Sequence, residues 1–273
     1  MSVMSPPSPR LLAPPGPTGA EPSGGTRFGL LGPLQLRCGE REIELSAAKQ
    51  RALLALLAIN VNRPVQVDRI IAELWQADEP ESARKTLQGY VWRLRGLLGK
   101  GAVRTTGSAY TLLTEAGSID AVRFETLAES GRAALRTGDH GQAGRLLRGA
   151  LELWRGPALV DVPLGPSVFG YVSRLEEARV LAAEGLVEAE LALGRHAEVL
   201  PVLRGLVAEH PLRERLRSQL MLALLRDGRQ AEALAAYGEL RDLLIEDQGL
   251  DPGRAVTELH RRILAGDPTL HLG

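Results

Sequence analysis

The chain has 273 residues, of which 44% are hydrophobic and 24% charged, the balance of an ordinary globular protein. This length predicts about two domains and excludes a disulfide-stapled miniprotein. No uncharged apolar run reaches the roughly 18 residues that a membrane span needs, so we expect no membrane association. With a single cysteine, Cys38, and no compact apolar stretch near its start, the chain is expected in the cytoplasm.

The charge is unevenly distributed, although 33 basic residues balance 33 acidic ones overall. Residues 27–113 hold 13 basic and 8 acidic residues, whereas residues 114–273 hold 19 and 24. Such asymmetry favours a basic part that faces a polyanion, with ordinary scatter of charges as the alternative.

Composition and hydrophobic pattern divide the chain into three parts. Residues 1–26 are expected to be disordered, because Met1–Gly25 contains seven prolines and four glycines. Residues 27–113 predict a domain of strands, three helices and a hairpin. The expected strands are Phe28–Leu31, Leu34–Cys38 and Glu42–Leu45, the helices Ala47–Asn60, Val67–Trp75 and Glu81–Leu98, and the hairpin strands Ala102–Thr106 and Ala109–Leu113.

Residues 119–268 predict an all-α domain of about seven helices. The run Gly-Arg-His-Ala-Glu at Gly194 returns as Gly-Arg-Gln-Ala-Glu at Gly228, a spacing of 34 residues, with a weaker third copy at Gly138. This spacing is typical of tetratricopeptide helix pairs. The expected fold is therefore mainly α, with a small-sheet domain followed by a tetratricopeptide-like helical domain.

The helix expected at Glu81–Leu98 has two distinct faces. At about 100° per residue, its apolar residues form one continuous stripe that must pack on other helices. The opposite face gathers charge, because six basic residues and no acidic one lie between Ala83 and Arg104. Because a large aromatic side chain is seldom left exposed on a polar face, Trp92 indicates that a partner covers this face. The alternative is a basic face that is only solvated.

This polar face has the side chains that suit DNA. Arg84, Gln88 and Arg95 are expected to reach base edges, because arginine matches guanine and glutamine matches adenine in the major groove. Lys85, Trp92 and Arg93 at the margins are expected on the DNA backbone. The hairpin that follows offers Arg104, Thr105 and Thr106 to the neighbouring minor groove or its phosphates, although a charged sheet edge is the simpler alternative for a hairpin alone.

Three runs carry a family resemblance. They are Lys49-Gln-Arg-Ala-Leu-Leu-Ala-Leu-Leu, Leu74-Trp75, and Ser82-Ala-Arg-Lys-Thr-Leu-Gln-Gly-Tyr-Val-Trp-Arg-Leu-Arg95. They resemble the OmpR-type winged helix-turn-helix of the Streptomyces antibiotic regulatory protein family. The later runs Trp154-Arg-Gly-Pro-Ala-Leu and Arg174-Leu-Glu-Glu-Ala-Arg179 resemble that family's bacterial transcriptional activation domain. Lys49 and Arg51 of the first run are further expected contacts to the DNA backbone.

The resemblance implies an activator that binds direct repeats in double-stranded promoter DNA, as a dimer on DNA, at the nucleoid. It implies recruitment of RNA polymerase, including the sigma factor, through the loop before the recognition helix: Gln76, Ala77, Asp78, Glu79 and Pro80. Larger members continue into an ATPase domain, but this chain has no Gly-x-x-x-x-Gly-Lys-Ser/Thr run, so it is a small member or the front of a larger one. The wing departs from the family pattern, with Ser108 and Ala109 between Gly107 and Tyr110.

No enzyme, metal or cofactor is expected. The five histidines show no His/Cys pairing at metal-ligand spacing, and no nucleophile elbow or dinucleotide loop is present. The alternative to a DNA-binding activator is a helical-repeat adaptor, in which the basic face meets an acidic protein partner. Activation rather than repression rests on the resemblance alone.

Overall fold

The computed structural model describes residues 25–271, which fall into two compact units. The first unit contains residues 25–129 and 149–180, and the second contains residues 130–148 and 181–271. The tract expected to be disordered lies almost wholly outside the described residues, although Thr26 already belongs to a strand. The mainly helical architecture with small antiparallel sheets confirms the expected fold class.

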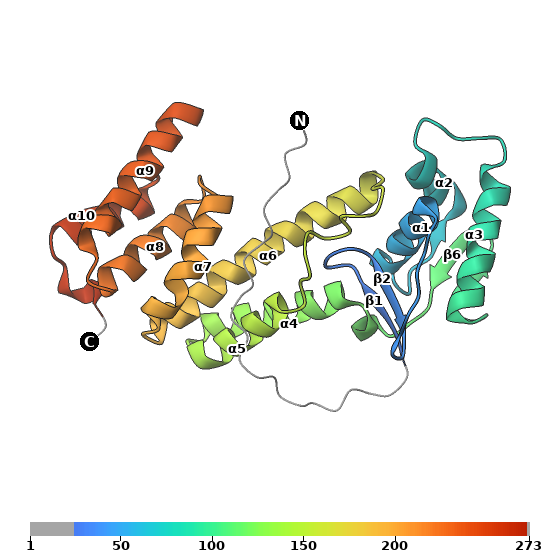
Figure 1. Ribbon diagram of the computed structural model, residues 1–273, viewed down its shortest axis with the longest axis horizontal. Coiled ribbons are helices and arrows are strands. Elements are labelled where there is room, and N and C mark those ends of the chain that lie inside the picture. Colours follow the sequence, from blue (N-terminus) through green and yellow to red (C-terminus); the bar gives the residue numbers. More distant parts are fainter. Residues whose placement is uncertain (1–24, 272–273) are drawn as a thin grey trace. The chain divides into compact units, whose positions relative to one another are not determined.

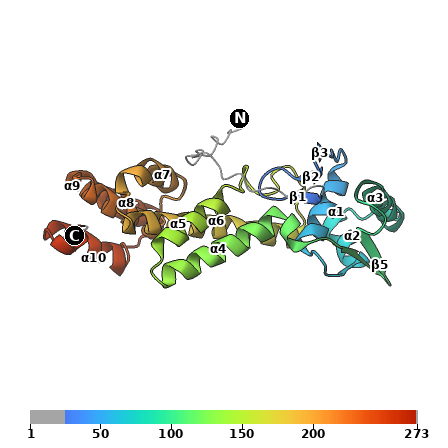
Figure 2. The ribbon, with the colours of Figure 1, turned by 90° about the horizontal axis from the view of Figure 1, so that it is seen from below.

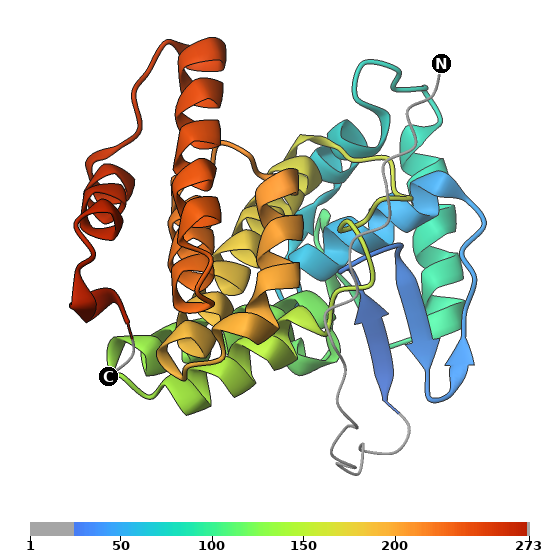
Figure 3. The same ribbon diagram turned by 60° about the vertical axis from the view of Figure 1, so that its left-hand side comes forward.

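The first unit opens with a three-stranded antiparallel sheet of β1 (Thr26–Gly29), β2 (Gln35–Cys38) and β3 (Arg41–Glu42), shown in blue in Figure 3. Phe28 lies opposite Leu36 in the ladder, and both side chains are buried. Gly32 turns the chain between the first two strands at a φ of 145°. The first strand lies two residues earlier than expected, and the second and third strands are shorter than expected. Leu30, Leu31 and Leu45 are buried outside the ladder.

Three helices follow: α1 (Ala48–Ile59), α2 (Val67–Trp75) and α3 (Ala83–Leu98). The interior of α1 is almost wholly apolar, and every residue from Ala52 to Ala58 is buried. The buried residues of α3 recur at helical spacing, which confirms the amphipathic pattern: Ala83, Leu87, Val91 and Leu94. Leu97 is 39% exposed, so the packed stripe ends before the helix does.

A second antiparallel sheet forms the wing. It consists of β4 (Val65–Gln66), β5 (Val103–Thr106) and β6 (Ala109–Leu112), in the order β4-β6-β5. The hairpin of β5 and β6 turns at Gly107, whose φ is 56°, a conformation that glycine adopts without strain. Figure 2 shows β5 beside α3. The strand β4 was not expected, because two residues are too few to show an alternating pattern.

The first unit also includes part of the helical region. Helices α4 (Asp120–Arg136), α5 (His140–Leu151) and α6 (Pro166–Ala192) contribute residues to both units. The 152–165 connection between α5 and α6 bonds to the loop between β1 and β2 through main-chain groups. The Arg155 N–H donates to the Leu31 carbonyl and the Leu159 N–H to the Gly32 carbonyl, both at 2.8 Å. This connection is therefore an integral part of the first unit.

In the second unit, α7 (His196–Glu209), α8 (Glu214–Arg226), α9 (Gln230–Gln248) and α10 (Arg254–Leu264) follow one another, with α8 between α7 and α9 in Figure 1. The turns at Gly138, Gly194 and Gly228 share one geometry, with φ values of 76°, 78° and 76°. In each turn the next residue donates to the carbonyl five positions earlier, the hydrogen bond of a Schellman motif. The repeat expected from the sequence is thus present as a repeated helix-ending turn.

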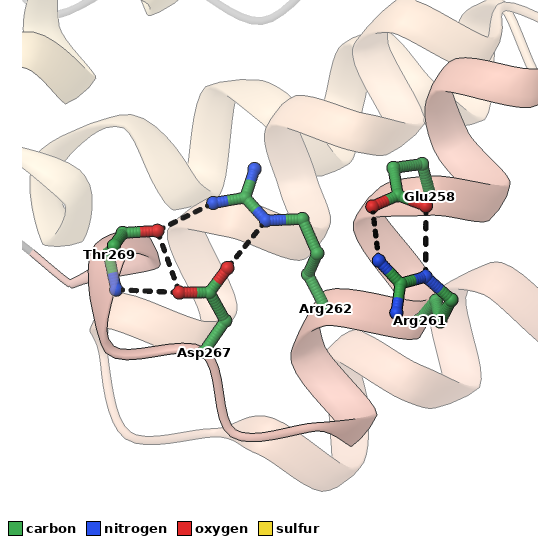
Figure 4. Close-up of polar contacts among 5 residues, drawn as sticks. All are labelled: Glu258, Arg261, Arg262, Asp267 and Thr269. Atoms are coloured by element: carbon green, nitrogen blue, oxygen red, sulfur yellow. Dashed lines mark hydrogen bonds and ion pairs between the residues drawn. The ribbon is translucent and has the colours of Figure 1, made fainter.

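Two carboxylates of the second unit, the buried Glu190 and the half-buried Asp267, each accept several hydrogen bonds. Glu190 is 3% exposed and accepts hydrogen bonds from Arg148 at 2.7 Å and Arg195 at 3.0 Å. Near the C-terminus, Asp267 accepts from the Thr269 main chain and hydroxyl and from Arg262 (Figure 4). These bonds, led by the one from the Thr269 hydroxyl, lower the pKa of Asp267 to about 2.

Candidate nucleic-acid interface

The outward face of α3 is basic and open to solvent. Its exposed side chains are those expected to meet DNA: Arg84, Lys85, Gln88, Trp92 and Arg93. Trp92 is 75% exposed, the largest exposed fraction among the big hydrophobic side chains of the described residues. An indole displayed among cations suits a surface that a partner covers.

At the start of this face, Arg84 has a partner that the sequence did not suggest. Its Nη2 donates to Oδ1 of Asp68, which lies in the first turn of α2. Both side chains are largely exposed, at 64% for Arg84 and 79% for Asp68. The pair therefore lies on the surface that α3 presents, rather than beneath it.

Arg95 differs from the other residues expected to contact bases. It is half-buried, and its Nε donates to the Val103 carbonyl at 2.9 Å while its Nη2 donates to the Thr105 hydroxyl at 2.6 Å. In this structure the guanidinium thus joins α3 to strand β5. The helical wheel placed Arg95 correctly on the polar side but could not show the wing beside it.

The expected wing residues Arg104, Thr105 and Thr106 are all exposed on β5. The wing tip is fixed to the start of α2, because the Val67 N–H donates to the Ser108 carbonyl at 2.8 Å. The Ser108 hydroxyl also donates to the Gln66 side-chain oxygen at 2.9 Å. The tip of the wing is consequently joined to the start of α2, while Arg95 joins α3 to strand β5.

Lys49 and Arg51, expected on the DNA backbone, have partners within the chain. Lys49 Nζ donates to the Leu74 carbonyl at 2.9 Å and lies 4.9 Å from the centre of the Trp75 ring. Arg51 donates to the Leu45 carbonyl at 3.0 Å and to the Asp161 carbonyl at 3.2 Å. Both cations contribute to packing within the first unit, so the structure does not bring them together with the α3 face.

Every residue of the loop expected to face polymerase is exposed: Gln76, Ala77, Asp78, Glu79 and Pro80. Gln76 has a φ of 50°, an uncommon backbone conformation for a residue other than glycine. The loop is held at both ends, where the Asp78 N–H donates to Trp75 and the Ala83 N–H to Pro80, each at 2.9 Å. Its acidic side chains contrast with the basic face of α3.

The sequence analysis did not single out Asp68, nor two carboxylates that bond to the loop between β1 and β2: Asp120 at the start of α4 and Asp161 in the 152–165 connection. Asp120 accepts from the Leu30 N–H at 2.7 Å, and Asp161 accepts from the Leu34 N–H at the same distance. An acidic residue in the first turn of the helix before a recognition helix is the signal that could have drawn attention to Asp68.

The fold and this surface define a class: a winged helix-turn-helix joined to a helical activator domain. The chain matches the family model of the bacterial transcriptional activator domain over residues 119–264. It matches the C-terminal domain of transcriptional regulatory proteins over residues 40–108. The chain belongs to the Streptomyces antibiotic regulatory protein family of transcriptional regulators, as expected from the sequence.

Individual relatives agree with this assignment. The regulatory protein DnrI of Streptomyces peucetius is 38% identical, with 89% of this chain and 93% of DnrI covered. The regulatory protein AfsR of Streptomyces griseus is 40% identical over 89% of this chain, which spans only 25% of AfsR. The solved structure of Mycobacterium tuberculosis EmbR, in complex with a low-affinity phosphopeptide, has a TM-score of 0.85 at 39% identity and covers 89% of this chain and 66% of EmbR.

None of the helices between residues 25 and 271 is both long and apolar enough to cross a bilayer. Over the same residues, histidine, cysteine and carboxylate side chains do not gather in groups of three that could hold a metal ion.

Proposed function

We propose that this protein is a sequence-specific DNA-binding transcriptional activator. Helix α3 enters the major groove, where Arg84 and Gln88 contact base edges. Lys85, Trp92 and Arg93 contact the backbone, and Arg104 on the wing reaches the neighbouring minor groove or its phosphates. The observation that carries the proposal is the basic face of α3, which is exposed and includes the exposed Trp92.

For three basic side chains, contacts within the chain support roles that differ from those expected. Arg95 supports the wing through its bonds to Val103 and Thr105, and it contacts bases only if DNA draws it away from them. Lys49 and Arg51 do not contact DNA directly, because their cationic groups already have partners within the first unit. They support DNA binding by stabilising the packing of that unit.

The regulatory part of the proposal rests on the family. Two copies bind direct repeats of promoter DNA, and the 76–80 loop presents Asp78 and Glu79 to RNA polymerase and its sigma factor. The genes controlled are those of an antibiotic or another secondary metabolite. Since promoter DNA and polymerase meet at the nucleoid, the protein acts there. We propose the domain limits 27–113 for DNA binding and 119–268 for activation.

The first test is enrichment of target DNA from a pool of random duplexes by the full chain. We expect a repeated motif to emerge, and Arg84→Ala to relax the preference at one base position of each repeat. Lys85→Ala is the matched control, because loss of a phosphate contact weakens binding to all sequences about equally. If no motif emerges, the adaptor alternative replaces the proposal.

A second test separates activation from DNA binding. The double variant Asp78→Ala, Glu79→Ala should bind the enriched duplex as the wild type does, but fail to raise transcription from it by purified RNA polymerase holoenzyme. Equal stimulation by this variant would contradict the role of the 76–80 loop.

A further inference from the structure

Asp68 is an acidic residue at the beginning of a basic surface. The segment from Ala83 to Arg104 contains six basic residues and no acidic one, yet the Asp68 carboxylate reaches across from α2 to Arg84. DNA phosphates repel a carboxylate at this place, so its contribution to binding must come through something other than attraction for the backbone.

Stability does not account for the pair. Exposed ion pairs contribute about 0 to 1 kcal/mol, and both members of this one are more than half exposed. Asp68 also lies in the first turn of α2, where its charge suits the positive end of that helix's own dipole. That role needs no arginine, so the orientation toward Arg84 remains to be explained.

We propose that Asp68 is a positioning residue that holds the Arg84 guanidinium ready for a guanine; the inference rests on the proposed DNA-binding function. A guanidinium has five N–H donors in a rigid plane. Asp68 takes one donor of Nη2, which leaves the second hydrogen of Nη2 and those of Nη1 for the two acceptors of guanine, N7 and O6.

Positioning has a measurable consequence for specificity. A free arginine side chain samples many rotamers and can reach phosphates as well as bases, whereas a held one is already ordered before DNA arrives. Asp68 therefore raises the discrimination between guanine and other bases at one position of the site, while it lowers the attraction of the surface for DNA of any sequence.

The experiment is a double-mutant cycle on the full chain with fluorescence anisotropy. Affinities are measured for the enriched duplex and for its three variants at the base pair that Arg84→Ala relaxes. We expect Asp68→Ala to reduce discrimination at that base pair about fivefold or more, and to do nothing further in the Arg84→Ala background. Asp68→Glu keeps the carboxylate and should restore part of the discrimination, while thermal melting checks that each variant is folded.

Other outcomes overturn the proposal in distinct ways. An effect of Asp68→Ala that persists without Arg84, at another base pair, would mean that Asp68 itself accepts from a cytosine amine. Tighter binding to all duplexes with unchanged discrimination would make Asp68 only a repulsive charge. A wild type without any base preference would overturn the proposed function together with this inference, whereas unchanged discrimination in Asp68→Ala overturns the inference alone.

Discussion

Gly165 lies so close to α2 that an added side chain would collide with Glu73. A Cβ built at Gly165 falls 2.1 Å from Glu73 Oε2, 2.7 Å from the Glu73 carbonyl oxygen and 3.0 Å from its Cα. The carboxylate could rotate away, but the main chain of α2 could not. Gly165→Ala must therefore push the start of α6 away from α2.

The cost follows from the contacts that this displacement removes. Both carboxylate oxygens of Glu73 accept from the Ser167 N–H, at 3.0 and 3.1 Å, and so cap the positive end of α6. Overpacking costs about 1 to 3 kcal/mol, and a hydrogen bond to a charged group contributes about 1.5 to 3 kcal/mol. We expect Gly165→Ala to lower the free energy of unfolding of the first unit by about 2 to 4 kcal/mol.

Urea unfolding monitored by tryptophan fluorescence measures this loss, because Trp75, Trp92 and Trp154 all lie in the first unit. Gly170→Ala is the matched control: it lies in α6 with no atom within 4 Å of an added Cβ, and alanine there should stabilise by up to about 1 kcal/mol. A Gly165→Ala variant as stable as the wild type would refute the packing of the 152–165 connection and α6 on the winged helix.

Three further predictions concern other contacts. Arg95→Ala should speed hydrogen exchange of the β5 amides and weaken binding to all DNA sequences. An unchanged exchange rate would contradict the role of Arg95 in holding the wing. Glu190→Gln should lower the stability of the second unit by about 1 to 2 kcal/mol in thermal melts, because its arginine partners are partly exposed, while the more exposed Glu188→Gln should change it little. The stabilisation from Asp267 should be complete above the ordinary aspartate pKa of about 3.9 and be lost as the pH falls through about 2, the value to which its pKa is lowered. A carboxyl NMR titration checks that midpoint, which Thr269→Val should raise; a midpoint near 4 in the wild type would contradict the observed bonds.

The two faces of α3 were predictable because one physical rule determines them. Buried residues spaced along α3 must face the core, so the charged residues between them must face outward, and the structure places Arg84, Gln88 and Trp92 there. Arg95 shows the limit of the rule. A helical wheel gives the direction of a side chain, but the wing strand that receives it is determined by tertiary packing.

The fusion of the winged helix with residues 149–180 was not predictable for a different reason. The prolines and glycines between α5 and α6 predict a break in the helices, and the break is present. Most of its bonds to the loop between β1 and β2 go to main-chain groups of Leu30, Leu31 and Gly32, which leave no side-chain pattern in the sequence. Asp68 was missed similarly, because its partner is 16 residues away on another helix.

We propose that α3 distinguishes base pairs, and a salt series tests this most directly. Anisotropy titrations of the full chain compare the enriched duplex with a scrambled duplex of the same composition, from about 50 to 200 mM salt. Base contacts predict tighter binding to the enriched duplex, with a ratio of affinities that persists as salt rises. Equal affinities that fall together with salt would contradict the claim and leave only a non-specific basic surface.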